Sequence, residues 1–416
     1  MISNVIHTFG SKIVIAAISF AILLLNANFL GAEGLGTVGL FVLNITLVIL
    51  LSNLICGSII YFSSRSNKSN LTFNAYLWSM ISIFIFWGVN QLYSIIDEHL
   101  AVHLYALSFL QASMSIHQYL LLGEEKIKLS NLISSLQTII TFISLLIFYY
   151  LFELNTVLAF IYSLYISYGI SWILALALSI SGLPKIDPKS LARDFKQSFQ
   201  YGFYAQAANT FQLLNYRISY FFLDAFSGRA ALGTYTAGVQ FSEALLMPGR
   251  SIATVQYARI SRKRKDIYAR RVTILFMKLS FLATLIGTAI LLAIPSQFYT
   301  FLLGDDFTNV KPILWAMSFG IVALSAEIVL SHYFSGTGQQ KKNSLSAFIG
   351  LIVTLIGCFT LIPTYGAIGA ALTTAFSYST MFLFLLILML KNRKNKAIEF
   401  IPNRSDWMLL KRLFKF

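Results

Sequence analysis

The chain has 416 residues, of which 57% are hydrophobic and only 11% are charged, and its mean hydropathy is +0.73. This composition excludes a soluble globular protein and indicates an integral membrane protein. The net charge of +15 is accounted for by membrane topology, as shown below, so it does not call for a nucleic-acid partner.

Apolar runs of about 20 residues, the length that crosses the hydrocarbon core as a helix, occur twelve times. We therefore predict an all-α integral membrane fold with twelve transmembrane helices, at residues 11–30, 38–62, 71–96, 100–122, 129–152, 157–180, 203–226, 235–260, 272–295, 312–335, 344–362 and 368–390. The first ten residues lack the basic region of a cleavable signal, so we expect the first helix to be retained.

The distribution of Lys and Arg predicts the orientation. If the N-terminus is inside, nearly all basic residues fall on the inner side, including a cluster at 259–271 and the end of the chain, and only Arg229 and Lys311 fall in outer loops. Cytoplasmic loops of membrane proteins carry such an excess. We therefore expect a multi-pass protein of the bacterial inner (cytoplasmic) membrane with both termini in the cytoplasm.

The chain also repeats itself. Residues 31–37 (GAEGLGT) follow the first predicted helix and recur as 228–234 (GRAALGT) after the seventh, and residues 117–126 resemble 332–341. We expect an N-terminal six-helix lobe at 1–183, a cytoplasmic linker at 184–202 with a short interfacial helix at 190–200, a C-terminal six-helix lobe at 203–390 and a basic cytoplasmic tail at 391–416. Because six is even, the lobes share one orientation and are related by a pseudo-two-fold axis along the membrane normal.

Two other features invite a functional interpretation. The GxGxxG match at 34–39 joins two membrane-length helices and follows no strand, so we interpret it as an outer turn between packed helices and not as a nucleotide site. We expect His117 and His332, near inner helix ends, to cap helices or lie at headgroup level, with pH sensing as the alternative.

Arg217 and Arg250 lie near the middle of predicted spans. An arginine at bilayer depth costs about 2.5–3.5 kcal/mol on insertion scales, so it generally faces a polar cavity. Arg217 is about 13 Å of helical rise from Phe226, too deep to reach the interface easily. Pro248 and Gly249 should break the helix beside Arg250, which either frees backbone groups for a ligand or only kinks the helix.

Polar residues recur on the same two helices at intervals of three or four, which places them on one face of each. We expect Asn209 and Tyr216 to join Arg217 in binding substrate, and Gln240 to join Arg250. Two acids are also submerged. Glu243 either couples transport to an ion or compensates the charge of an arginine, with Arg250 on its own helix face, and Glu327 is a candidate for coupling to H⁺ or Na⁺. We expect no metal site and no other cofactor.

These residues resemble a known family. The resemblance lies in Asn28 to Gly39, Tyr201-Gly202 with the following Arg217 helix, residues 303–307 (LGDDF) and residues 362–371 (IPTYGAIGAA). Together they are similar to bacterial polysaccharide flippases, the O-antigen translocases of the Wzx type in the multidrug/oligosaccharidyl-lipid/polysaccharide exporter (MOP) superfamily. The resemblance implies two six-helix lobes as in MATE transporters, and alternating access that carries an undecaprenyl-diphosphate-linked oligosaccharide, such as an O-antigen or capsule unit, to the periplasmic leaflet. Glycan polymerase and chain-length proteins are the implied protein partners, and membrane lipids surround the chain.

Two other functions stay open. A multidrug-type cation antiporter coupled to H⁺ or Na⁺ has the same fold, but its cavity should be acidic, whereas this chain places two arginines there. A membrane enzyme such as a glycan polymerase normally needs a substantial periplasmic loop, and the longest outer loop here is short, at 296–311. No P-loop or nucleophile elbow is present in the sequence. We therefore expect a transporter and not an enzyme.

Overall fold

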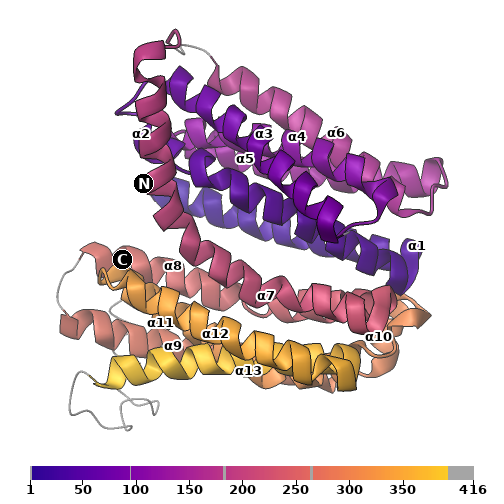
Figure 1. Ribbon diagram of the computed structural model, residues 1–416. Coiled ribbons are helices and arrows are strands. Elements are labelled where there is room, and N and C mark those ends of the chain that lie inside the picture. The colour runs from indigo at the N-terminus through magenta and orange to yellow at the C-terminus, as the bar shows by residue number, and fades with distance from the viewer. Residues whose placement is uncertain (1, 94, 181–183, 263–265, 392–416) are drawn as a thin grey trace. The chain divides into compact units, whose positions relative to one another are not determined.

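A computed structural model describes residues 2–93, 95–180, 184–262 and 266–391. The predicted tail after Lys391 and part of the basic cluster at 259–271 lie outside the described residues. Within the described ranges the structure is helical and contains no strand. The elements follow in chain order (Figure 1): α1 Ile2–Cys56, α2 Ile59–Phe62, α3 Lys68–Tyr93, α4 Glu98–Gly123, α5 Ile127–Leu146, the π-helical turn η1 Ile147–Leu151, α6 Val157–Ser179, α7 Pro188–Ala244, α8 Met247–Arg262, α9 Asp266–Ala293, α10 Ser296–Leu303, the 3₁₀ turn η2 Asp305–Phe307, α11 Val310–Gly336, α12 Gln340–Thr360 and α13 Ile362–Lys391.

The prediction of an all-α membrane fold is confirmed. Eight helices among the described residues are long and apolar enough to cross a membrane, and the first of them, Gly10–Phe62, contains two of the predicted segments. The three predicted segments outside these eight helices lie in α4, α7 and α8. The polar residues of α7 include Asn209, Tyr216, Arg217, Gln240 and Glu243, which the sequence marks as candidate site residues.

Two glycines break long helices at equivalent points of the sequence repeat. Gly31 in α1 has φ 66° and ψ −171°, and Gly228 in α7 has φ 83° and ψ 174°. This region of backbone conformation is open essentially to glycine alone. The residues after each glycine are helical again, so the predicted glycine-rich outer turn at 34–39 is wrong. One glycine is enough to change the direction of the chain, and the remaining glycines of the motif continue the helix.

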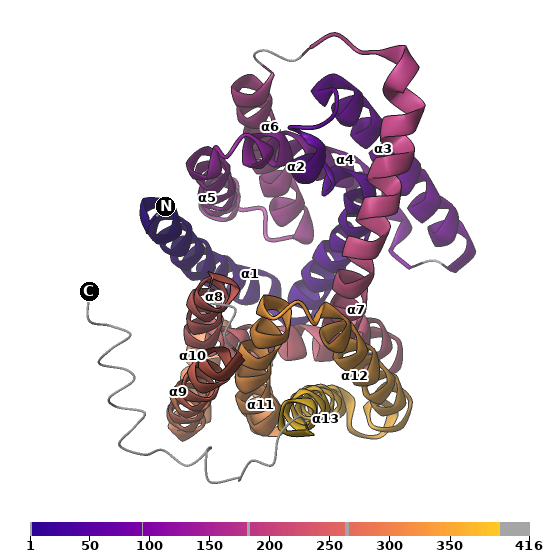
Figure 2. The same cartoon turned by 90° about the vertical axis from the view of Figure 1, so that its left-hand side faces the viewer.

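The described chain forms two compact units. Unit 1 comprises Met1–Thr210 with Leu302–Asp306, and unit 2 comprises Phe211–Phe301 with Phe307–Phe416. In unit 1, α6 packs against α4 and α5, and α1 packs against α5. In unit 2, α13 packs against α11 and α12, while α8 and α9 pack against α11, and Figure 2 shows α11, α12 and α13 side by side.

Buried polar side chains of unit 1 bond to one another between helices. The Tyr149 hydroxyl donates to Asn26 Oδ1 at 2.7 Å inside the apolar core. His117 is 1% exposed, and its two ring nitrogens lie 2.8 Å from the hydroxyls of Tyr76 on α3 and Ser179 on α6. The expectation that His117 caps a helix is therefore wrong, and its level in the membrane stays a prediction. It joins three helices, because a buried polar group is costly without a partner.

The start of α7 is bound tightly to unit 1. The Asp187 carboxylate accepts hydrogen bonds from the Ser190 hydroxyl and the Lys189 amide, which lower the pKa of that carboxyl from its ordinary value. Asn70 of α3, fully buried, donates to Asp187 O and Asp194 Oδ2. The predicted interfacial helix at 190–200 is thus the first part of the long helix α7.

The aromatic face of this first part of α7 packs on α3. The Trp78 ring lies 5.2 Å from that of Phe199 and 6.2 Å from that of Phe195, centroid to centroid. Both phenylalanines belong to the same apolar cluster as Ile55, Leu71 and Ile116. Protein therefore covers the aromatic face of this segment. An interfacial helix would turn the same face toward lipid.

A short segment from late in the chain completes unit 1 at the Gly31 kink. The Ala32 amide, just after the kink, donates to Asp306 Oδ2 at 3.2 Å, and Asn28 Nδ2 donates to Leu302 O at 2.6 Å. A carboxylate at the start of a helix satisfies an amide that has no helical partner. The two motifs 28–39 and 303–307, far apart in sequence, are neighbours here.

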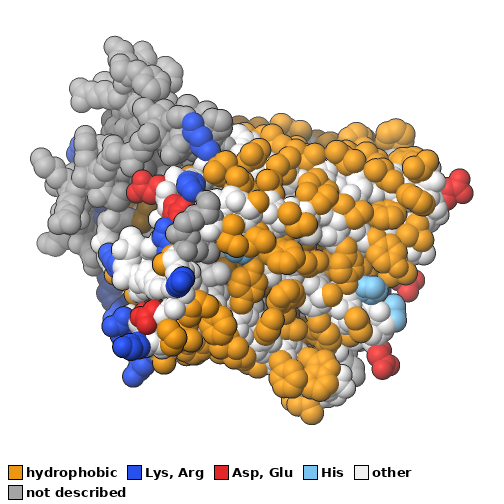
Figure 3. All heavy atoms as spheres, turned by 90° about the horizontal axis from the view of Figure 1, so that it is seen from above, with side chains coloured by type: hydrophobic (Ala, Val, Ile, Leu, Met, Phe, Trp, Pro, Cys, Tyr) orange, Lys and Arg blue, Asp and Glu red, His pale blue; other side chains and the backbone are white. Residues whose placement is uncertain are grey.

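The surface pattern agrees with a membrane protein. Figure 3 shows a broad band of hydrophobic side chains on one face, with Lys and Arg side chains gathered at one end of the band, His side chains toward the other, and acidic side chains at both ends. Such a band is the surface expected to contact lipid hydrocarbon. The one-sided distribution of positive charge follows the pattern on which the predicted orientation rests.

Candidate functional site

Arg217 lies in unit 2, on the part of α7 that precedes the Gly228 kink. Its Nη2 lies 2.8 Å from Glu243 Oε1, and its Nη1 donates to the Tyr220 hydroxyl at 2.5 Å. Each side chain of the Arg217–Glu243 pair is 26% exposed. The guanidinium is thus held among protein groups but remains accessible. The guanidinium has five N–H donors, so some donors remain available beside the bonds to Glu243 and Tyr220.

The Gly228 kink brings these two residues together. Arg217 and Glu243 are 26 residues apart, which corresponds to about 39 Å along a straight helix. Their contact requires the chain to reverse between them, and Gly228 is the residue of α7 with non-helical dihedral angles. The charge-compensating partner of Glu243 is therefore Arg217, across the kink. Arg250, the partner considered from the sequence, does not pair with Glu243 in the described structure.

Four tyrosines surround Arg217 and are here called the tyrosine cluster: Tyr216, Tyr220, Tyr235 and Tyr378. The ring centroids of Tyr220 and Tyr235 are 5.6 Å apart, and those of Tyr216 and Tyr378 are 5.3 Å apart, in edge-to-face geometry. The Arg217 guanidinium carbon lies 5.2 Å from the centroid of the Tyr220 ring. Edge-to-face packing and a cation near a ring face are both favourable. The cluster therefore holds the guanidinium in one orientation.

The helix break predicted at Pro248 and Gly249 is present just before them. Helix α7 ends at Ala244 and α8 begins at Met247. The Thr284 hydroxyl lies 3.4 Å from Leu245 O, a carbonyl at the break. A Cβ atom on Gly249 would lie 2.5 Å from Ser280 Oγ, so glycine allows α8 to approach α9 closely. Thr284 occupies this freed carbonyl, which favours a structural role for the break.

The remaining charged candidates gather around Tyr216. The Tyr216 phenol lies within electrostatic range of Glu327, Arg250 and Glu243. Glu327, on α11, is 5% exposed, while Arg250 is exposed. Among the described residues neither side chain makes a hydrogen bond or an ion pair. Glu327, Glu243 and Arg250 thus lie near Tyr216, the residue that precedes Arg217.

The other two candidates are placed differently. Gln240 is half-buried on α7 in unit 2. Asn209 is exposed and falls in unit 1, where it donates to Gln206 Oε1 at 2.6 Å. Sequence reasoning did not single out Tyr235 and Tyr378. Tyr235 follows the repeated motif 228–234 and could have been found as a phenol at the start of a predicted span, but Tyr378 lies far away on α13 and carries no local signal.

The described residues contain no group of three or more His, Cys, Asp or Glu side chains that could hold a metal ion. The side chains gathered around Arg217 carry guanidinium, carboxyl and phenol groups. Such a set can bind an anion at Arg217, where the anion takes the place of the Glu243 carboxylate. A carboxyl of the same set can take up a cation or a proton.

A family model matches more than half of the chain. Residues 1–263 match the family model described as polysaccharide biosynthesis protein. An uncharacterized membrane protein of Methanocaldococcus jannaschii is 29% identical over 123 residues, which are 29% of this chain and 23% of that protein. The capsular polysaccharide biosynthesis protein CapF of Staphylococcus aureus is 29% identical over 153 residues, 35% of this chain and 39% of that protein. The matched segments therefore span well under half the length of these curated relatives.

Solved structures show the fold. The lipid II flippase MurJ in an inward closed conformation matches with a TM-score of 0.71 at 16% identity, covering 99% of this chain and 96% of that chain. An inward-facing multidrug resistance MATE family transporter of the MOP superfamily matches with a TM-score of 0.67 at 16% identity, covering 90% and 95%. The chain has the fold of these membrane transporters, and by its sequence it belongs to the polysaccharide biosynthesis protein family.

Proposed function

We propose that this protein is a flippase that moves an undecaprenyl-diphosphate-linked oligosaccharide from the cytoplasmic to the periplasmic leaflet of the inner membrane by alternating access. Its family and its transporter fold support membrane transport in polysaccharide biosynthesis. The cargo is an O-antigen, capsule or similar repeat unit, and the partners are enzymes that polymerise it.

The observation that carries this proposal is Arg217, a partly exposed guanidinium inside unit 2 of a membrane protein. A diphosphate offers several acceptor oxygens in the geometry that a planar guanidinium fork binds well. The cargo diphosphate would replace the Glu243 carboxylate on Arg217, and Arg250 would add a second positive charge. A cationic drug would gain nothing from either arginine, so the site disfavours the multidrug-type alternative.

Transport is further proposed to be coupled to a cation at Glu327. A carboxylate that is 5% exposed and makes no ion pair among the described residues is costly unless a proton or Na⁺ neutralises it. Neutralising Glu327 also removes one negative charge near Tyr216, which makes the site more favourable for the anionic cargo. Cation uptake and cargo binding then support each other by linkage.

Glycan export in cells tests the proposal. We expect Arg217→Ala and the double variant Arg217→Ala, Arg250→Ala to abolish surface glycan, and Arg217→Lys to restore only part of it, because an ammonium keeps the charge and loses the fork. Lys196→Ala, which removes an exposed positive charge from the first part of the same helix, is the matched control and should export normally. Normal surface glycan in the double variant would refute a cationic cargo site.

A further inference from the structure

Uncharged polar side chains meet between α4 and α5 of unit 1. They are here called the amide cluster: Gln111 and Gln118 of α4 with Ser134 and Gln137 of α5. Gln137 Nε2 donates to Gln111 Oε1 at 3.2 Å, and Gln118 Nε2 donates to Ser134 Oγ at 3.1 Å. Gln111 and Gln118 lie on one face of α4, about 10 Å apart along its axis. The cluster therefore presents two pairs of polar groups along the line where the two helices face each other.

The Gln111–Gln137 pair lies at the depth of the membrane interior. Helix α5 belongs to the candidate membrane span Ile127–Leu151, and Gln137 is about 15 Å of helical rise from its start and about 21 Å from its end. Both carboxamides are half-buried, so protein does not enclose them fully. A carboxamide turned toward hydrocarbon loses hydrogen bonds at a high free-energy cost. The exposed part of the pair must therefore face water or a polar ligand, and not lipid.

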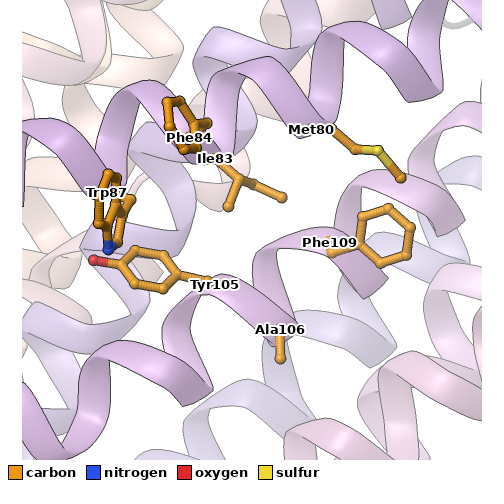
Figure 4. Close-up of a pocket in the computed structure, with 7 residues that line it drawn as sticks. All are labelled: Met80, Ile83, Phe84, Trp87, Tyr105, Ala106 and Phe109. Atoms are coloured by element: carbon orange, nitrogen blue, oxygen red, sulfur yellow. The ribbon is translucent and has the colours of Figure 1, made fainter.

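The opposite face of α4 has the apolar character that lipid requires. Figure 4 shows Tyr105, Ala106 and Phe109 of α4 lining an apolar pocket together with residues of α3. At 100° per residue these three lie about 180° around the helix from Gln111 and Gln118. Helix α4 therefore separates an apolar face toward α3 from a carboxamide face toward α5.

The amide cluster has hydrogen-bonding groups to spare. Gln111 Nε2 and the Oε1 atoms of Gln118 and Gln137 make no hydrogen bond within the described residues, and all three atoms remain accessible. Residues 104–122 and 129–151 contain no Asp, Glu, Lys or Arg. A phosphate or carboxylate anion offers acceptors, an ammonium group offers donors and hydrocarbon offers neither, whereas a hydroxyl offers both. The ligand that uses open donors and acceptors side by side is a neutral compound rich in hydroxyls.

We propose that the amide cluster binds the sugar part of the lipid-linked cargo, an inference that rests on the proposed function and adds a binding site to it. The carboxamides exchange hydrogen bonds with sugar hydroxyls, while the guanidinium of Arg217 in unit 2 takes the diphosphate. A site built to bond a hydroxyl discriminates against a ligand that lacks it, because its polar groups are then left unpaired. The cluster thereby selects carrier lipid that bears a glycan over the bare carrier.

Binding of two lipid probes to the full-length protein tests this site. The probes are undecaprenyl diphosphate and the lipid-linked repeat unit extracted from the cells that make this protein. Native mass spectrometry of the protein in detergent gives a dissociation constant for each. We expect the wild type to bind the sugar-bearing probe about tenfold more tightly, the gain from one or two net hydrogen bonds.

The double variant Gln111→Leu, Gln137→Leu removes both members of the deep pair, so that neither is left without its partner. It should lose the preference for the sugar-bearing probe and bind undecaprenyl diphosphate as the wild type does. Thr141→Val is the matched control on the same helix, because Thr141 is 5% exposed and its hydroxyl donates to Gln137 O. This variant should bind both probes normally.

Gln118→Leu keeps the test decisive if the double variant folds poorly. Its partner Ser134 retains a hydrogen bond to Ser130 O, so the substitution strands no hydroxyl. We expect the preference for the sugar-bearing probe to fall about threefold, the effect of one weak hydrogen bond.

Three results would overturn the inference. An undiminished preference in the folded variants would leave water as the occupant of the cluster. An equal loss of both probes would mean that the carboxamides only join α4 to α5. Equal affinity of the wild type for both probes would refute a sugar site while the proposed function stands, whereas failure to bind either probe would refute the proposed function itself.

Discussion

Arg217 and Glu243 neutralise each other within unit 2. Substitutions of this pair can therefore test whether Arg217 binds the cargo or only stabilises the fold. Removal of one partner from a poorly solvated pair leaves the other charge without compensation. Arg217→Ala should therefore lower the stability of the purified protein by about 1–2 kcal/mol, a value reduced for the partial exposure of both side chains. Thermal unfolding in detergent measures this loss.

A second substitution distinguishes the two roles. In the double variant Arg217→Ala, Glu243→Gln no carboxylate is stranded, so we expect stability and abundance to return toward the wild-type values. Surface glycan should remain absent, because the guanidinium that binds the diphosphate is still missing. If glycan export returns together with stability, Arg217 serves the fold and not the cargo.

Glu327 offers a test of coupling at the same scale. Glu327→Gln keeps the size of the side chain and removes the exchangeable proton. We expect normal abundance and normal binding of a lipid-linked diphosphate, but transport that no longer responds to an imposed H⁺ or Na⁺ gradient, measured in proteoliposomes. Full gradient-dependent transport by this variant would leave Glu327 as a structural group.

At the scale of the helix, the Gly31 and Gly228 kinks share one backbone geometry but differ in their surroundings. A Cβ on Gly31 would lie 2.6 Å from Asp306 Oδ2, whereas at Gly228 and at Gly88 of α3 no atom lies within 4 Å. Both kink glycines have the positive φ that costs other residues about 1–3 kcal/mol, and Gly88 does not.

These differences predict a graded series of glycine variants. Gly31→Ala should be the most destabilising, because it combines backbone strain with displacement of Asp306. Gly228→Ala should cost only the strain of about 1–3 kcal/mol. Gly88→Ala should be neutral or stabilise by up to about 1 kcal/mol, since alanine suits a helix better. Unfolding midpoints of the three purified variants check this order, and equal midpoints for Gly31→Ala and Gly88→Ala would contradict it.

At the scale of the whole molecule, the orientation of the chain can be tested by cysteine labelling. The native residues Cys56 and Cys358 are buried and give little background. Cysteines at Ser66, Lys189 and Lys394 should react with a membrane-impermeant reagent only from the cytoplasmic side, and cysteines at Glu98 and Asn309 only from the periplasmic side. Reaction at Lys189 from outside would refute the predicted topology. Lys394 lies outside the described residues, so its label tests the sequence prediction alone.

The two units share the kink geometry of an internal repeat but not its chemistry. The repeated motif predicts equivalent breaks after the first and seventh predicted spans, and the structure places Gly31 and Gly228 there. The paired arginine and glutamate, together with Glu327, occur in unit 2. Unit 1 carries neutral hydrogen bonds such as Tyr149 to Asn26, and its ion pairs, such as Lys68 with Glu124, lie at helix ends.

The sequence alone determined the features that depend on local composition. Apolar length predicted where helices lie, the repeated glycine-rich motif marked the two kinks to within a few residues, Pro248 and Gly249 marked the end of α7, and submerged Arg217 marked the candidate site. The kinks, the helix break and the candidate site all reflect the free-energy cost of placing a charge, a proline or a positive φ in a membrane helix. That cost depends on the residue itself and can be estimated without knowledge of any neighbouring helix.

Only the tertiary structure decided which side chains meet. Spacing along one helix suggested Arg250 as the partner of Glu243, whereas the reversal at Gly228 brings Arg217 to it. Tyr378 joins the site from α13, and His117 is buried between α3 and α6. The physical reason is that membrane helices are apolar on every side, so a hydrophobic pattern does not reveal which face packs against protein and which faces lipid. That choice depends on the rotation of each helix and on the direction the chain takes after each kink.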